Sequence, residues 1–171
     1  MARTPRHRTL TAPLLRPWLT EVETPDAFLL LNFLGELSRR VTAAYGTFVR
    51  PYGIDFSEYV VLWAALLFEP QLPAISELRR QVVMSSGGIA LAVNRLERKR
   101  LVRRKTSAHD GRAVLVQLTA KGRRLITEMM SADMARHEEL LEGLGDARRT
   151  AMLDGLAEVL HLVMQSPDYA G

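Results

Sequence analysis

The chain has no cysteine among its 171 residues, and aromatic residues make up only 6% of it. The absence of cysteine excludes a disulfide framework, a cysteine-ligated zinc site and a thiol redox switch. It also fits a cytoplasmic protein. No apolar run approaches the ~20 residues that a membrane-spanning helix needs, so we expect no membrane partner. The length suits one compact domain.

The signatures of common enzymes and metal sites are incomplete. A segment beginning at His137 starts like the helix of a zinc protease, but Leu141 stands where the second histidine is required. Gly143–Gly145 begins a dinucleotide-binding pattern, but Arg148 occupies the place of its third glycine. No phosphate-binding loop or nucleophile elbow is present. We therefore expect no enzymatic activity, cofactor or metal; metal sensing through His137 or His161 is the alternative.

Acidic residues are scarce in the middle of the chain. Between Gln71 and Arg124, 13 Lys and Arg accompany only three acids. The flanking segments are acidic, since residues 21–70 carry three basic and seven acidic side chains and residues 125–171 carry three and nine. Residues 1–20 form a basic arm with four arginines and no acid. A basic block in an otherwise acidic chain indicates a surface that meets polyphosphate, although a solvated charged face is the other explanation.

Helical periodicity and capping patterns predict the helices. Thr24-Pro25 opens a predicted helix over about 25–50, and an Asp55-x-x-Glu58 capping pattern opens the next. Two short helices follow at about 75–81 and 86–99, the second capped by Ser85, with the spacing of a helix-turn-helix. Long helices are expected at about 120–144, where Thr119 is the cap, and at about 147–165.

Two β-like runs, 101–106 and 113–118, lie on either side of Asp110-Gly111, which is a strong hairpin signal. A hairpin directly after a recognition helix forms a wing. The last helix is apolar on more than one face, which favours burial in a dimer interface with the first helix; intramolecular packing is the alternative.

Residues 77–125 resemble the MarR family of winged helix-turn-helix regulators. The resemblance rests on short blocks in a specific order: Leu78 and Val82; Ser85-Ser86-Gly87; Arg95-Leu96-Glu97; Leu101-Val102-Arg103-Arg104; Asp110-x-Arg112-Ala113; and Leu118-Thr119-x-Lys121-Gly122-Arg123. Including the flanking helices, it covers about residues 26–165. It implies a mainly α fold with a small β-hairpin wing, dimerising through N- and C-terminal helices. It also implies binding of a palindromic site in double-stranded DNA as a homodimer, most often as a repressor, with a small ligand often lowering the DNA affinity.

The expected organisation follows from this resemblance. Residues 1–23 form a basic N-terminal arm, residues 24–52 and 119–171 supply the dimerisation helices, and residues 53–118 form the DNA-binding lobe of one compact domain. The N–H groups at the start of the recognition helix would hold a phosphate, and side chains one turn further would reach base edges. Arg112 at the wing tip would enter the minor groove, pair with Asp110, or do both. The expected DNA-binding residues are Ser85, Ser86, Gly87, Ala90, Leu91, Asn94, Arg95, Arg103, Lys105 and Arg112. Arg95 is expected at a phosphate or an acid rather than at a base.

The chain departs from the family pattern at four positions. Ala90 and Leu91 stand where polar or basic side chains are usual, Arg79 replaces a small residue, and Arg100 replaces a glycine. Few direct hydrogen-bonding groups remain, so we expect more reliance on the wing, the backbone and DNA shape. The alternative is a winged-helix dimer that acts as a non-specific DNA-binding or protein-interaction module.

The family's effector site usually lies between the dimerisation helices and the DNA-binding lobe. Aromatic walls there would suit a small aromatic or phenolic ligand, and the candidates are Tyr45, Phe48, Tyr52, Tyr59 and Trp63. Plain core packing is the alternative for each of them. Val60 stands where the urate-responsive branch has an acid, which counts against urate.

Overall fold

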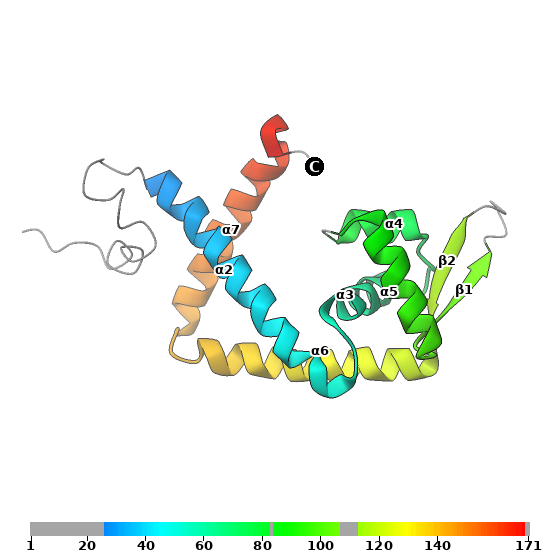
Figure 1. Cartoon of the computed structure of the whole chain (residues 1–171). Helices are drawn as coiled ribbons and strands as arrows, with labels where there is room; N and C mark the ends of the chain where they lie inside the picture. Colours follow the sequence, from blue (N-terminus) through cyan, green and yellow to red (C-terminus); the bar gives the residue numbers. More distant parts are fainter. Residues whose placement is uncertain (1–25, 83, 107–112, 170–171) are drawn as a thin grey trace, which may run out of the picture. The chain divides into compact units, whose positions relative to one another are not determined.

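A computed structural model describes residues 26–82, 84–106 and 113–169. The chain divides into two compact units, with the boundary between Thr119 and Ala120. The first contains α2 (Asp26–Phe48), the 3-10 helix η1 (Arg50–Tyr52), α3 (Phe56–Leu67), α4 (Ile75–Gln81), α5 (Ser86–Arg98), β1 (Val102–Thr106) and β2 (Val114–Leu118) (Figure 1). The second contains α6 (Ala120–Leu141), α7 (Asp146–Gln165) and the 3-10 helix η2 (Pro167–Tyr169). The basic arm, the Asp110-Gly111 turn and Arg112 lie outside the described residues.

The predicted class, mainly α with a β-hairpin wing, is confirmed, and two predicted caps are formed. The Asp55 side chain accepts from the backbone N of Glu58 at 2.9 Å, and the Glu58 carboxylate accepts from the backbone N of Asp55 at 2.8 Å. This reciprocal pair satisfies donors that the first turn of α3 leaves without helical partners. Ser85 caps α5, because its Oγ accepts from the backbone N of Gly88 at 3.1 Å.

The core of the first unit lies where α3, α4 and α5 pack with the hairpin. One face of α5 is fully buried, with the spacing expected of an amphipathic helix; it consists of Ile89, Ala92, Val93 and Leu96. The other elements contribute Val61, Leu62, Leu78, Val102, Val116 and Leu118. The outer face of α5 is therefore held at the surface by a packed layer beneath it.

The wing is a two-stranded antiparallel hairpin, and a short segment at Pro73 and Ala74 pairs with its second strand. The strands pair in register from Val102 opposite Leu118 to Thr106 opposite Val114. Along the other edge of β2, the Pro73 carbonyl accepts from the backbone N of Val116 at 2.9 Å, and Ala74 forms a bridge with Leu115. The local sequence pattern around Pro73 does not predict this pairing. Proline lacks an N–H but keeps its carbonyl, so it can serve at an edge.

Arg100 occupies a left-handed backbone position, with φ of 60°. Its N–H donates to the Glu97 carbonyl, and the N–H of Leu101 donates to the Leu96 carbonyl, both at 2.9 Å. These two bonds form a Schellman motif at the end of α5, with buried Leu96 and Leu101 at its hydrophobic contact. A side chain at this position is strained, which gives a physical reason for the glycine that the sequence resemblance leads one to expect there.

The second unit is two helices joined by a short connection. Arg149 of α7 pairs with Glu138 of α6 and donates to the Leu141 carbonyl at 2.7 Å. No residue of α7 is buried, although the helix carries large apolar side chains. Within the described residues, no helix has the length and apolar character that crossing a bilayer requires.

Candidate nucleic-acid interface

The outer face of α5 presents a stripe of exposed residues at helical spacing: Gly87, Leu91, Asn94 and Arg98. Leu91 is 52% exposed, whereas Ala90 is half-buried beside the stripe. An apolar side chain here can contact a thymine methyl group, and Asn94 can donate to or accept from a base edge. These residues therefore have the chemistry for direct base contact, with Leu91 more accessible than Ala90.

The amino end of α5 receives a guanidinium from α4. Ser85 is engaged as the cap, and Arg79 Nη1 lies 3.4 Å from Ser86 Oγ as a hydrogen-bond donor. The positive end of the helix dipole and an arginine thus meet at Ser86–Gly87, an arrangement suited to a phosphate. Sequence reasoning noted Arg79 only as a departure; the position of α4 relative to α5 gives it a role.

The carboxyl half of the stripe is joined to the wing by Arg104 of β1. The Arg104 guanidinium donates to Asn94 Oδ1, and its Nη1 lies 3.4 Å from Glu97 Oε2. The backbone N of Arg104 also donates to Glu97 Oε1 at 3.3 Å. In the sequence, Arg104 was noted only as part of the block Leu101-Val102-Arg103-Arg104, without a role of its own. Strand alternation could have identified its position, because Arg104 shares a face with buried Val102.

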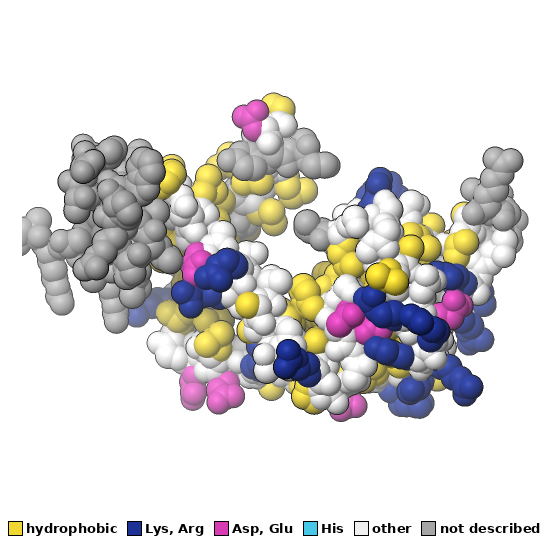
Figure 2. Space-filling view, viewed as in Figure 1, with side chains coloured by type: hydrophobic (Ala, Val, Ile, Leu, Met, Phe, Trp, Pro, Cys, Tyr) yellow, Lys and Arg dark blue, Asp and Glu magenta, His cyan; other side chains and the backbone are white. Residues whose placement is uncertain are grey.

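Arg103 and Lys105 are exposed on β1. The same alternation places both side chains on the face of the hairpin opposite to Arg104. They therefore do not join the network around Asn94, and any DNA contact they make is separate from the α5 stripe. Lys and Arg side chains gather over α5 and β1, with acidic side chains among them (Figure 2).

Arg95 points to the amino end of α3 rather than along the α5 stripe. Its Nη2 lies 2.9 Å from Asp55 Oδ2 and donates to Ser57 Oγ at 2.7 Å. Of the two partners considered for Arg95, a phosphate or an acid, the structure shows an acid.

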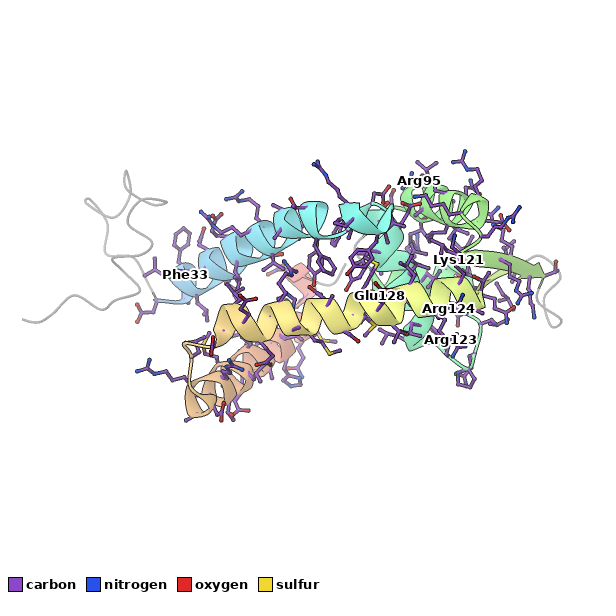
Figure 3. All side chains as sticks on the ribbon, turned by 90° about the horizontal axis from the view of Figure 1, so that it is seen from below. Phe33, Arg95, Lys121, Arg123, Arg124 and Glu128 are labelled. Atoms are coloured by element: carbon purple, nitrogen blue, oxygen red, sulfur yellow. The ribbon has the colours of Figure 1, made fainter. Side chains whose placement is uncertain are left out.

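Arg95 is labelled in Figure 3, together with the exposed basic residues at the start of α6, namely Lys121, Arg123 and Arg124.

The hydrogen-bond donors and positive charges around Asp55 lower the pKa of its carboxyl group. Partial burial alone would raise the pKa of the Asp55 carboxyl. Hydrogen bonds from the Ser57 hydroxyl and the Glu58 N–H, together with the charges of Arg95 and Lys99, lower this pKa by more than burial raises it. The net result is a pKa below the usual value for aspartate. Asp55 is therefore charged while it holds α3 and α5 together.

Four of the five aromatic candidates for ligand binding lie together. Tyr45 stacks on Tyr59, with ring centroids 5.4 Å apart. The centroid of the Phe48 ring lies 6.1 Å from that of Tyr59, in an edge-to-face contact, and 5.7 Å from that of Tyr52. Phe56, which the sequence analysis missed, stacks on Tyr45 at 5.2 Å. Rings in such contacts stabilise one another. Trp63 lies one helical turn beyond Tyr59 on α3.

The histidines of the terminal helices have local partners. His137 Nε2 lies 3.6 Å from Asp133 Oδ1, which also accepts from Arg136 at 2.6 Å. His161 contacts Gln165 at 2.9 Å. In the part of the chain that the structure describes, no group of three or more His, Cys, Asp or Glu is placed to hold a metal ion.

Comparison with known proteins identifies the family. The family model for transcriptional regulator SarA/Rot matches residues 43–129, just over half of the chain. The regulator MhqR of Bacillus subtilis is 25% identical over 123 residues, covering 72% of this chain and 83% of MhqR.

Solved structures agree on the fold. A mutant MarR of Escherichia coli matches with a TM-score of 0.68 and 20% identity, covering 82% of this chain and 99% of that one. BpsR of Bordetella bronchiseptica, whose DNA binding is regulated by 6-hydroxynicotinic acid, matches with a TM-score of 0.63 and 22% identity, covering 75% and 90%. The prediction of a DNA-binding transcriptional regulator rather than an enzyme is confirmed. The chain belongs to the SarA/Rot family of transcriptional regulators, whose model matches residues 43–129, and its fold is that of the MarR winged helix-turn-helix structures, as the sequence resemblance predicted.

Proposed function

We propose that this regulator is a sequence-specific repressor that binds a palindromic operator as a homodimer. The observation that carries the proposal is the exposed stripe of α5, with Arg79 at one end and Arg104 beside the other. The packed layer beneath α5 supports this helix, groups able to contact bases lie along its middle, and Arg79 at its amino end is the cation proposed to meet a phosphate. Residues 53–118 are then the DNA-binding lobe. The proposed place of action is the cytoplasm.

Apolar surface on the terminal helices supports the homodimer. On α7, Leu153, Leu160, Leu162 and Met164 are each more than half exposed. On α2, Phe28 and Leu37 are likewise exposed. Burial of these side chains against a second copy would remove apolar area from water. The same surface of both copies would then form a two-fold symmetric interface. Residues 24–52 and 119–171 therefore form the proposed dimerisation region.

A small aromatic or phenolic ligand is the proposed effector. The support is the ring cluster of Tyr45, Tyr59 and their neighbours, together with the ligand-regulated DNA binding of BpsR. Because these rings already contact one another, a flat ligand would bind by replacing one ring contact with its own. Titration of the purified protein with phenols, followed by tyrosine fluorescence and DNA affinity, tests this.

The function itself is tested by selecting bound sequences from a randomised duplex library at near-physiological salt. Enrichment of a palindrome, with half-sites about one helical turn apart, is the expected result. Binding without enrichment would contradict sequence-specific reading and favour the alternative, a non-specific DNA-binding module. Absence of binding would favour a protein-interaction module.

A further inference from the structure

Arg104 of β1 is hydrogen-bonded to the side chain of Asn94 on the exposed face of α5. Asn94 is exposed on the α5 stripe, and its Oδ1 accepts from the Arg104 guanidinium. Arg104 is held in turn by Glu97, which accepts from its backbone N at 3.3 Å and lies 3.4 Å from its Nη1. The three residues form a connected network in which Glu97 positions Arg104 and Arg104 positions Asn94.

The chemistry of the guanidinium determines the orientation of the amide. Arginine has only donors, so the amide atom directed at Arg104 must be the oxygen, and the Nδ2 group is directed away from it. Recognition of adenine by asparagine uses the oxygen and the nitrogen together, because adenine presents both a donor and an acceptor in the major groove. Guanine and thymine present acceptors there, which the Nδ2 group alone can satisfy.

We propose that Arg104 is a specificity-determining positioning residue. By occupying one lone pair of Oδ1 and holding the amide so that Nδ2 is the group presented to the base, it makes the recognition helix select guanine or thymine, and disfavour adenine, at one position of each half-site. This inference rests on the proposed function, since it presupposes sequence-specific reading of duplex DNA. It differs from a simple phosphate contact by Arg104, which would strengthen binding to every sequence alike.

The test is a set of selections from one randomised duplex library with the wild-type protein and matched variants. Asn94→Ala first identifies the half-site position, because that position alone should lose its preference. Arg104→Gln should then discriminate against adenine at this position about tenfold less strongly than the wild type does. In the double variant, the loss of discrimination should not exceed that of Asn94→Ala alone, because the two residues act as one unit.

Arg103→Gln is the control for charge. It removes the same charge from the neighbouring position on the opposite face of β1, so any effect on affinity should apply to all sequences and leave the base preference intact. Glu97→Gln tests the network without removing Arg104, and it should relax the same base preference to a smaller extent. Thermal unfolding monitored by circular dichroism shows whether each variant is folded.

Two outcomes would overturn the inference while leaving the proposed function intact: a wild-type preference for adenine at the Asn94 position, or an unchanged preference in both Arg104→Gln and Glu97→Gln. A wild-type protein that enriches no sequence would remove the proposed function, and this inference with it.

Discussion

Lys99 donates from Nζ to Glu58 Oε2 at 2.7 Å and so joins the end of α5 to the start of α3. The Glu58 side chain is 1% exposed and also accepts from the backbone N of Asp55. Lys99 makes a second bond, to the Gly53 carbonyl at 2.9 Å. Glu58, which belongs to the capping box of α3, therefore also anchors the end of α5, the recognition helix.

Loss of this anchor should destabilise the protein. Lys99→Met leaves a buried carboxylate without its ammonium partner, and we expect a loss of about 2 kcal/mol in the free energy of unfolding. Urea denaturation at pH 7 measures it. Lys105→Met, at an exposed position on β1, is the matched control and should change stability by less than about 0.5 kcal/mol. Equal effects of the two substitutions would contradict the anchor.

Glycine at position 100 should stabilise the fold. Arg100 adopts a φ of 60°, which costs a non-glycine residue about 1–2 kcal/mol. Arg100→Gly should therefore raise the unfolding free energy by about 0.5–1 kcal/mol, after the greater freedom of glycine in the unfolded chain is subtracted. Arg98→Gly, in the last turn of α5, should have the opposite sign. A loss of stability in Arg100→Gly would show that the strain is absent.

Stability should fall in acid through Asp55. Its pKa is lowered in the folded state, so its contribution is complete above the pKa of the unfolded chain. That contribution is lost as the pH falls through the lower, folded value, which places the loss below about pH 4. Asp55→Asn retains a capping side chain without the charge. It should be less stable than wild type at pH 7, and the difference should shrink in urea titrations near pH 3; a constant difference would contradict the assignment.

An acidic substitution on α7 should disrupt the proposed dimer. Leu160 is 59% exposed in the single chain, and Leu160→Glu would place a charge inside the interface. Sedimentation velocity should show a monomer, or a dimer that dissociates at much higher concentration, together with weaker binding to a two-half-site operator. Glu158→Gln, nearby on the same helix, should remain dimeric. A wild-type protein that sediments as a monomer would refute the interface.

Arg79 should strengthen DNA binding without specifying sequence. Its guanidinium lies at the amino end of α5, beside Ser86. Arg79→Gln should lower the affinity for all duplexes and reduce the salt dependence by about one phosphate contact. Arg39→Gln on α2 is the control, since Arg39 pairs with Glu36 of its own helix. A change in sequence preference in Arg79→Gln would indicate base contact instead.

Much of the fold could be predicted because its signals are local. The capping box of Asp55 and Glu58, the Ser85 cap and the alternation of the hairpin each involve residues only a few positions apart. The pairing at Pro73 could not be predicted in this way, because its hydrogen bond goes to Val116, far along the chain. The site was predicted as a list of residues on the recognition helix and the wing, without the pairing of Arg104 with Asn94 or the particular acid that Arg95 meets.

The sequence by itself therefore determined the helices, the wing, the family and the surface on which the positive charge gathers. Tertiary structure decided the roles of individual side chains. It directs Arg95 towards Asp55, brings Arg104 to Asn94, and stacks Tyr45 on Tyr59 and Phe56. The physical reason is that periodicity and capping depend on near neighbours, whereas these pairings depend on which faces of separate elements meet when the core packs.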